Sequence, residues 1–409
     1  MRRIGNLLLL LCAGIALGTL SLTLVYLLPA APMQAHMRAC IDSYVAEGDN
    51  PFVMEGYKGS SLDNYTDAIM LANAVYASEA PAWQAAMRVE RWEKDGEQNQ
   101  EALREYLTEG SSDRVSGYAR YWHGYLMLLK PLLLVFNYPQ IRMLNGIVML
   151  VLTGLLFRGF RKRRMKRSMI AMLLALMSLF PAALPFSLQF STAFYTGMTA
   201  CLVVLYRYEA IEERDVWCGF FFLTGMLTSF FDFLTYPLFT FGMPIVLCLT
   251  LKRPGRREGL FFLTKAGAAW CAGYAGMWAG KWTVGSLLGG VNIWKDAVYT
   301  VGVRASSSAY EEHVSRILAV LRNFYIYFNP YGMLLWAILA VWVGAYLWRR
   351  RKEGWDSHTM LMLAIACLPI LWYLAAANHS YVHYWYSFRN LAVSVFAAGM
   401  ITETRSGRQ

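Results

Sequence analysis

Residues 7–28 read LLLLLCAGIALGTLSLTLVYLL and lie just after the basic pair Arg2 and Arg3. As a helix that rises 1.5 Å per residue, this run is about 33 Å long, which is enough to cross the ~30 Å hydrocarbon core of a bilayer. It is also longer than the roughly 7–15 apolar residues of a cleaved signal peptide. The run therefore predicts an uncleaved signal anchor with its N-terminus inside, and cleavage near Ala31 is the alternative.

Apolar runs of similar length recur along the 409-residue chain, which is 57% hydrophobic and only 16% charged. This composition excludes a disordered or fibrous protein and is unusual for a soluble domain. The predicted fold class is an all-α polytopic membrane protein with about ten transmembrane helices. After the first, the predicted spans are 141–158, 168–187, 189–207, 216–233, 236–251, 260–284, 331–348, 359–377 and 388–403.

Charge is distributed unevenly around the net value of +11. Residues 30–120 contain 15 acidic and 8 basic side chains, a net charge of −7, so the remaining chain carries 12 acidic and 30 basic side chains, a net charge of +18. Basic clusters at 158–167, 252–257 and 349–352 adjoin apolar runs, as cytoplasmic turns do under the positive-inside rule. This pattern predicts a multi-pass protein of the cell (plasma or inner) membrane with both termini cytoplasmic and its long loops outside.

Five regions follow from this topology. They are the signal anchor (1–29), an outer loop with an acidic motif and an interfacial helix (30–140), transmembrane helices 2–7 (141–284), a second outer loop (285–330), and transmembrane helices 8–10 with a cytoplasmic tail (331–409). If the stretch Tyr118–Tyr138 were counted as a transmembrane span, the basic cluster at 158–167 would lie outside, against the positive-inside rule. We therefore interpret this stretch as a helix that lies in the outer interface or re-enters it.

Nucleotide-binding and metal-binding signatures are missing from the sequence. It contains no Walker-type loop, no GxGxxG after a strand and no Cys/His metal motif. Any chemistry is therefore expected on the outer side, near the membrane surface.

The sharpest local pattern is SSLDNYTD at residues 60–67. A serine cap followed by two aspartates predicts the start of a helix with Asp63 and Asp67 on one face, because residues four apart are neighbours on a helix. A carboxylate in this position would serve as a general base for an acceptor hydroxyl. The alternative is that acids in a first helical turn only complement the helix dipole.

Three further candidates, His123, Lys130 and Arg142, accompany the interfacial stretch. Lys130 and Arg142 would bind the phosphate of a lipid-linked donor. The alternative is that they are snorkelling cations beside an aromatic belt at the headgroup level. His123 is a candidate substrate-binding residue, with a hydrogen-bonded structural role as its alternative.

Asp232 and Lys281 are charged residues near the outer ends of apolar spans. A carboxylate at such a depth is costly and usually faces a cavity or a partner, so Asp232 is a candidate substrate-binding residue. The alternative is an ion pair that holds helices together. Lys281 is a candidate partner for Asp232 or for a phosphate.

The last outward turn contains His379, His383 and Arg389. Two histidines four residues apart can bind a metal ion on a helix, but no HExxH context accompanies them, and no metal ligand is assigned. A cluster that contacts a donor phosphate or a sugar is favoured. An interfacial aromatic belt is the alternative.

These features together resemble the GT-C superfamily of membrane glycosyltransferases. The nearest likeness is to its family 39-type members, which include protein mannosyltransferases and aminoarabinose transferases. In that family an Asp, often followed by a second acid, opens an amphipathic helix of the first outer loop, and DNYTDA at 63–68 is similar in position and setting. YWHGY at 121–125 loosely resembles the family's His-Pro-Pro stretch. Here the double proline is missing, and Asn64 stands in place of the second acid.

The resemblance implies transfer of a sugar from a polyprenyl-phosphate-linked donor to an outer-face glycan or glycolipid acceptor. It implies Asp63 as the base, with Asp67 as the alternative because the neighbouring acid is absent. No cofactor is assigned, and assistance by a divalent cation stays open. The expected partners are the lipid bilayer, the lipid-linked sugar and the acceptor, with no nucleic acid. A transporter or flippase for a lipid-linked saccharide and a non-catalytic subunit of an envelope assembly complex are the other two hypotheses.

Overall fold

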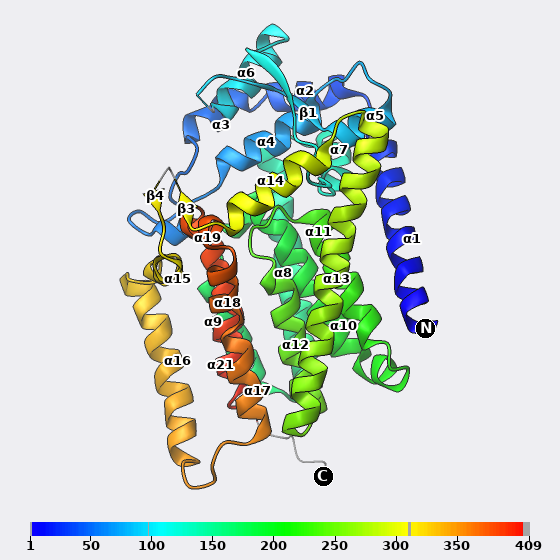
Figure 1. The fold of residues 1–409 in the computed structure, drawn as a ribbon. Helices are drawn as coiled ribbons and strands as arrows, with labels where there is room; N and C mark the ends of the chain where they lie inside the picture. The colour runs from blue at the N-terminus through cyan, green and yellow to red at the C-terminus, as the bar shows by residue number, and fades with distance from the viewer. Residues whose placement is uncertain (1, 97, 310–311, 404–409) are drawn as a thin grey trace.

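The computed structural model describes residues 2–96, 98–309 and 312–403 and is mostly helical (Figure 1). Within these residues, five helices are long and apolar enough to cross a membrane, which suggests a multi-pass membrane protein. Their bounds are Ile4–Val25, Tyr138–Lys162, Leu188–Glu213, Pro330–Arg349 and Ser357–Ala375. The first belongs to α1 (Arg2–Val25), as the opening leucine run predicts.

A mixed assembly of short elements covers one end of the helical bundle (Figure 1). We call residues 30–125, together with α14 (Ile293–Ala305), the cap. Its other elements are α2 (Ala30–Arg38), α3 (Ile41–Glu47), η1 (Lys58–Ser60), α4 (Asn64–Val75), α5 (Ala82–Arg88), β1 (Glu90–Glu93), α6 (Asn99–Glu109) and β2 (Arg114–Gly117). β1 and β2 pair antiparallel with Glu90 opposite Gly117, so the cap is not purely α-helical as predicted.

The predicted interfacial helix over 118–138 is shorter in the structure. Only α7 (Leu126–Leu133) is helical, and residues 118–125 form an irregular segment in front of it. His123 has a φ of 58°, a left-handed conformation that a continuous helix cannot contain. The amide of Gly124 donates to the Phe230 carbonyl at 2.9 Å, which ties this irregular segment to the bundle.

The bundle itself is built from long apolar helices that pack closely through small residues. They are α8 (Tyr138–Lys162), α9 (Lys166–Ser178), α10 (Leu188–Glu213), α11 (Trp217–Phe231), α12 (Leu238–Lys252) and α13 (Arg256–Gly289). A Cβ atom on Gly225 of α11 would lie 2.1 Å from the Trp270 carbonyl oxygen of α13. On α13, a Cβ atom on Gly273 would lie 2.0 Å from the Phe222 carbonyl oxygen. Glycine at both positions therefore permits the close approach of the two backbones.

The C-terminal third adds a second group of helices. After α14 come β3 (Ser308–Ala309), β4 (Glu312–His313), α15 (Arg316–Tyr325), α16 (Pro330–Arg349), α17 (Ser357–Ala366), α18 (Leu368–Ala375), α19 (Ala377–Val382), α20 (Tyr384–Ser387), η3 (Phe388–Leu391) and α21 (Ala392–Met400). The two residues of β3 pair antiparallel with those of β4. α14 crosses the capped end of the bundle from the end of α13 to β3 (Figure 1).

Three predicted spans are shorter or broken. The span 168–187 stops with α9 at Ser178 and continues as a turn and the 3₁₀ helix η2 (Leu184–Phe186), because Pro181 and Pro185 lack the amide that a continuing helix needs. The span 359–377 changes from α17 to α18 at Cys367, two residues before Pro369. The span 388–403 is helical mainly as α21, and short turns from α19 to η3 precede it.

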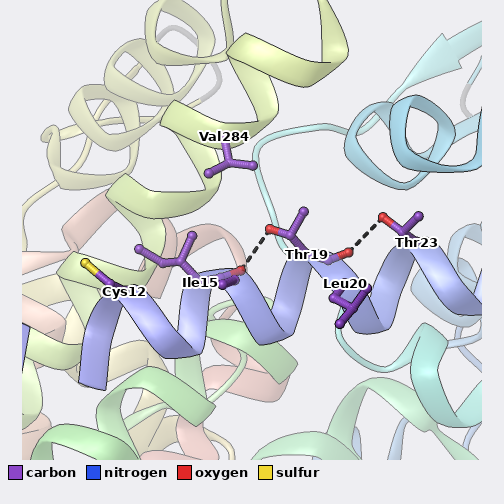
Figure 2. A pocket seen from close by; sticks show the side chains of 7 residues that line it. Cys12, Ile15, Thr19, Leu20, Thr23 and Val284 are labelled. Atoms are coloured by element: carbon purple, nitrogen blue, oxygen red, sulfur yellow. Dashed lines mark hydrogen bonds between the residues drawn. The ribbon is translucent and has the colours of Figure 1, made fainter. Parts of the chain in front are cut away.

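α1 packs on the outside of the bundle and is largely exposed. Only Gly18 and Leu22 of its described side chains are buried, and a cavity of about 500 Å³ lies between this helix and α13 (Figure 2). Thr19 and Thr23 on its wall donate to carbonyls of their own helix, at Ile15 and Thr19 respectively. Their hydroxyls are satisfied within α1, as an apolar environment requires.

Candidate active site

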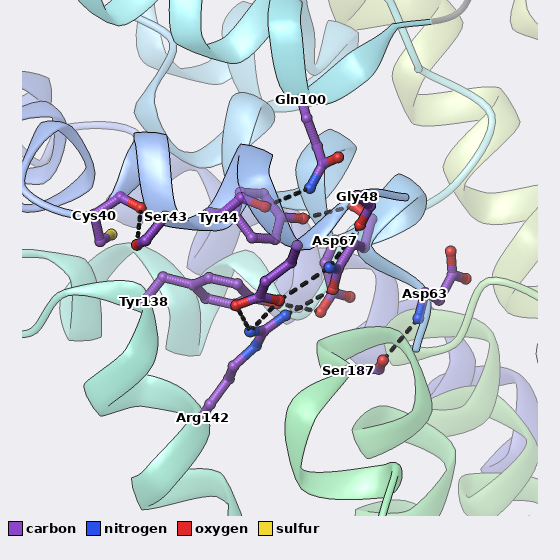
Figure 3. A network of polar contacts seen from close by, with 12 residues as sticks. Cys40, Ser43, Tyr44, Gly48, Asp63, Asp67, Gln100, Tyr138, Arg142 and Ser187 are labelled. Atoms are coloured by element: carbon purple, nitrogen blue, oxygen red, sulfur yellow. Dashed lines mark hydrogen bonds and ion pairs between the residues drawn. The ribbon is translucent and has the colours of Figure 1, made fainter. Parts of the chain in front are cut away.

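Asp67 lies at the centre of a buried hydrogen-bond network (Figure 3). Its Oδ2 accepts from the Tyr138 hydroxyl at 2.5 Å and from the Leu188 amide at 2.8 Å, and its Oδ1 accepts from the Gln189 amide at 3.1 Å. The two amides are the first of α10, and a helix N-terminus favours a carboxylate. Burial raises the pKa of Asp67 to about 6, although the hydrogen bonds oppose this change. Asp67 therefore joins α4 to α8 and α10.

Arg142 belongs to the same network, which engages both of its terminal nitrogens, while its buried Nε has no hydrogen-bond partner among the described residues (Figure 3). Its Nη1 donates to both carboxylate oxygens of Glu47 at 2.8 Å, and its Nη2 donates to Asn64 Oδ1 at 2.7 Å. The guanidinium also lies 4.2 Å from the centre of the Tyr138 ring. With these partners Arg142 holds α3, α4 and α8 together, and its terminal nitrogens are not free to bind a phosphate.

Asp63, one helical turn before Asp67, has a different environment. It is the N-cap of α4, where Oδ1 accepts from the Thr66 amide at 3.0 Å, while its own amide donates to Ser187 Oγ at 2.9 Å. The carboxylate points away from the Arg142 network (Figure 3), and its buried Oδ2 has no hydrogen-bond partner among the described residues. A carboxylate oxygen without a donor is the form that can accept a proton from a substrate.

The electrostatic environment of Asp63 suits proton transfer. Burial, with a smaller contribution from the Asp67 charge, raises the pKa of Asp63 to about 7. A general base works best when its pKa lies near the operating pH, because it is then both deprotonated and able to hold a proton. Of the two predicted aspartates, Asp63 therefore has the free oxygen and the pKa that a base needs.

Arg389 is a completely buried cation within electrostatic reach of Asp63. Its Nη2 donates to the Gly59 carbonyl at 3.1 Å, its Nη1 donates to the Trp385 carbonyl at 3.3 Å, and the guanidinium lies 3.8 Å from the centre of the Phe190 ring. Its Nε has no partner among the described residues. Backbone carbonyls and an aromatic face thus hold this charge without neutralising it.

Asp232 is the C-cap of α11 and is almost completely buried. Its Oδ2 accepts from the Thr235 amide at 2.9 Å, and its Oδ1 has no partner in the described part of the chain. The suggested ion pair with Lys281 is not formed, since Lys281 Nζ donates to the Met87 carbonyl at 3.0 Å. The turn that carries Asp232 includes Leu234, whose φ of 68° is a strained conformation for a branched side chain.

His379 contacts this turn, and the ring of His383 lies beside that of His379 with the ring centres 5.0 Å apart. His379 Nε2 donates to the Leu234 carbonyl at 2.8 Å, and its Nδ1 faces a guanidinium nitrogen of Arg304 from α14. His383 stacks on the ring of Tyr386, with the ring centres 5.1 Å apart. Burial lowers the pKa of His379 well below its usual value and that of His383 to about 3. Both imidazoles are therefore neutral at physiological pH.

His123 and Lys130 have structural partners within the cap and α1. His123 Nε2 donates to the Tyr118 carbonyl at 2.6 Å, and burial lowers the pKa of this histidine well below its usual value. Lys130 Nζ donates to the Ala74 carbonyl at 2.7 Å and lies 4.7 Å from the centre of the Tyr26 ring. Burial lowers the pKa of Lys130 to about 8. Both side chains are buried, and their hydrogen bonds hold neighbouring segments of the chain together.

An apolar groove of about 850 Å³ lies between α7, α8, α10 and α11. Its wall is almost entirely aliphatic and aromatic, with a few hydroxyls from α10 such as Ser191 and Thr196. Leu188 lines the groove, and the preceding Ser187 binds the Asp63 amide. The groove therefore ends close to the chain segment that positions Asp63.

The structure thus brings together residues that are far apart in the sequence. The charge of Arg389 acts on Asp63, and the charge of Asp63 acts on the phenol of Tyr386. His379 binds the turn that carries Asp232. Lys130, Arg142 and Lys281 are held elsewhere by their own partners. Ser187 and Arg304, which were not predicted, belong to the site, and neither stands in a motif that marks it in the sequence.

No group of three or more His, Cys, Asp or Glu side chains is arranged to hold a metal ion in residues 2–96, 98–309 and 312–403. Comparison with family models, with curated proteins and with solved structures finds no match to this chain.

Proposed function

We propose that this chain is an integral membrane glycosyltransferase that moves a sugar from a polyprenyl-phosphate-linked donor to a glycan or glycolipid acceptor. The observation that carries the proposal is the free, buried Oδ2 of Asp63, with a pKa of about 7, beside the end of an apolar groove. The two features fit a reaction in which a lipid-borne donor meets a general base at a membrane surface.

In the proposed topology, the chain crosses the plasma or inner membrane ten times. Both termini therefore lie in the cytoplasm. The cap then faces outward, and its net acidic sequence contrasts with the basic turns at the opposite end of the bundle. α7 and α15 lie in the outer interface. A donor carried on a long lipid reaches the cap from within the bilayer, by way of the groove.

The groove holds the isoprenoid chain of the donor. Its volume of about 850 Å³ is within the range of ligand sites, and its lining, which comes mainly from four helices, is predominantly apolar. An apolar surface binds hydrocarbon without directional contacts, so it does not distinguish one sugar from another. Specificity for the sugar therefore comes from the polar residues that lie past Leu188, outside the groove.

Asp63 takes the proton of the acceptor hydroxyl. The oxygen then uses its electron pair to form a bond with the anomeric carbon of the donor sugar, and the bond from that carbon to the phosphate oxygen breaks with its electrons left on the phosphate. Attack from the face opposite the phosphate inverts the anomeric centre. The products are the glycosylated acceptor and the polyprenyl phosphate, and Asp63 releases its proton to solvent.

Arg389 and Asp67 assist in different ways. The buried charge of Arg389 stabilises the negative charge that develops on the leaving phosphate, since such charges act strongly in a site that excludes water. Asp67 is a positioning residue, because it fixes the start of α10 and therefore Ser187, which binds the Asp63 amide.

A flippase for a lipid-linked saccharide would also use an apolar groove, so the test must separate transfer from transport. The full chain is reconstituted in vesicles with undecaprenyl-phosphate-linked sugars, labelled in the sugar, and a lipid extract that contains glycolipid acceptors. A transferase forms a labelled glycosidic product, whereas a transporter moves the donor across the bilayer unchanged. Asp63→Asn is expected to reduce product formation at least 100-fold.

The matched control is Asp42→Asn, which removes an exposed carboxylate from α3 in the same cap. This variant is expected to retain transfer. Equal activity in a folded Asp63→Asn variant would remove Asp63 as the base, and label that crosses the membrane without any new product would establish transport instead.

A further inference from the structure

Two arginines lie against the ring of Tyr118 in the cap, and a third acts on it through its charge. The guanidinium carbons of Arg91 and Arg120 lie 5.3 Å and 4.8 Å from the centre of this ring, and the charge of Arg304 acts on the same phenol. Arg91 belongs to β1, Arg120 to the irregular segment before α7, and Arg304 to α14. Three separate segments therefore bring their positive charges to one place.

The partners of these arginines leave part of each guanidinium unused. Arg91 pairs with Glu93, Arg120 Nη1 donates to Asp296 at 3.0 Å, and Arg304 pairs with His379. The Nε atoms of all three, and Nη1 of Arg91, are buried and lack a hydrogen-bond partner among the described residues.

Such groups are costly. Leaving a buried charged donor without an acceptor costs more free energy than leaving a neutral donor unpaired. Arg91, which is 7% exposed, has two of its three guanidinium nitrogens in this state. The simplest partner for several convergent N–H donors is an oxyanion, because guanidinium groups bind phosphate and carboxylate through paired N–H···O bonds.

The local charge favours an anion as well. Glu93 and Asp296 are the carboxylates that pair with the cluster, and Glu93 is shared with Arg114 at 3.6 Å. The imidazoles of His123 and His379 are neutral. Cations thus outnumber the anions that balance them.

We propose that Arg91, Arg120 and Arg304 form a binding site for an oxyanion, a phosphate or carboxylate group carried by a substrate. Only the attribution to a substrate rests on the proposed transferase function. The site uses β1, α14 and the segment before α7, whereas the apolar groove uses α7, α8, α10 and α11. Tyr386 connects the arginines with Asp63, since its ring centre lies 6.0 Å from that of His379, the partner of Arg304, and the charge of Asp63 acts on its phenol.

The position of the three arginines relative to Asp63 determines which part of a substrate they would bind. An acceptor with an anionic group bound at the arginines would present a hydroxyl to Asp63 from the cap side, opposite the groove. If the oxyanion instead belongs to the donor, the same arginines hold the phosphate that leaves. The shared chemistry is oxyanion recognition, and the two sources can be separated by experiment.

Binding is measured on the full chain in detergent by calorimetric titration with inorganic phosphate. Arg304→Gln and Arg91→Gln are each expected to weaken phosphate binding at least tenfold, since each removes one charged donor group. Arg104→Gln, which removes an exposed arginine from α6 in the same cap, is expected to bind phosphate as the wild type does. Because Arg91 is buried, Arg304→Gln carries the test if Arg91→Gln does not fold.

A second titration with farnesyl phosphate, a short isoprenoid phosphate, identifies the source. Loss of farnesyl phosphate binding in parallel with phosphate binding assigns the site to the donor. Retained farnesyl phosphate binding with lost phosphate binding assigns it to an anionic acceptor. Phosphate affinity that is absent in the wild type or unchanged in both variants overturns the proposal. Neither titration needs turnover, so its outcome is independent of whether Asp63→Asn abolishes transfer.

Discussion

Asp67 accepts hydrogen bonds through both carboxylate oxygens, whereas Asp63, four residues earlier on the same helix, leaves its buried Oδ2 without a partner among the described residues. Two residues of one type and one motif thus have different physical roles. Asp67 is bound by the start of α10 and by Tyr138, and Asp63 is left available for chemistry. The difference arises because the α10 amides point at only one of the two aspartates.

The pH dependence of transfer should follow Asp63. A base must be deprotonated to act, and burial raises the pKa of Asp63 to about 7. We therefore expect kcat/KM to rise with pH through about 7 and then to level off. The measurement is a pH–rate profile in vesicles between pH 5 and 9. A rate that is flat across pH 7 would mean that another group takes the proton.

Stability should respond to Asp63 in the opposite direction. Because the folded pKa of about 7 exceeds the usual value of 3.8, the folded protein binds more protons than the unfolded chain between these pH values. The contribution of Asp63 to stability is therefore full below pH 3.8 and is lost as the pH rises through 7. Asp63→Asn, whose amide can still cap α4, should raise the melting temperature at pH 8 relative to the wild type. A lower melting temperature at pH 8 would contradict this account.

Asp67→Asn should destabilise the fold. Three donors converge on the Asp67 carboxylate. The side-chain amide of an asparagine would point its own N–H groups at some of these donors. We expect a loss of about 2–4 kcal/mol in the free energy of unfolding. Unfolding in detergent, compared with Asp42→Asn as the exposed control, measures this difference. An Asp67→Asn variant as stable as that control would show that the network is not needed.

Filling the groove should weaken binding of the lipid donor. Thr196 on α10 lines the groove, so Thr196→Trp would occupy part of its 850 Å³. We expect KM for the lipid donor to rise about tenfold with little change in kcat, because the substitution lies away from Asp63. Thr283→Trp on the exposed face of α13 is the matched control. Identical KM values for the two variants would place the lipid elsewhere.

Gly225→Val should prevent normal assembly of the bundle. A Cβ atom at this position would lie 2.1 Å from the Trp270 carbonyl oxygen, and backbone cannot move away as a flexible side chain can. We expect the variant to be recovered as an aggregate or to melt far below the wild type in detergent. Gly154→Val on α8, where a Cβ atom meets nothing within 4 Å, is the control. Comparable recovery of the two would contradict the close approach of α11 and α13.

Much of the helical architecture follows from sequence pattern alone. The runs at 7–28, 141–158, 189–207 and 331–348 all correspond to helices long enough to cross a membrane. These elements are predictable because hydrophobic length is a local property that needs no knowledge of neighbours. The helix boundaries differ more from the prediction at 118–138 and 168–187, where prolines or a left-handed residue end a helix within an apolar run, whereas 359–377 coincides with the candidate span Ser357–Ala375.

The sequence by itself predicted a mostly helical chain with helices long and apolar enough to cross a membrane, and it placed Asp63 and Asp67 one helical turn apart. It could not decide between them, because a hydrogen bond from the Leu188 amide to Asp67 joins residues 121 positions apart. For the same reason it offered Arg142 for phosphate binding and Lys281 as a partner of Asp232 or of a phosphate, and only the fold shows that Glu47 and the Met87 carbonyl engage these side chains. The availability of a charged group depends on which donors and acceptors surround it, and only tertiary packing brings those partners together.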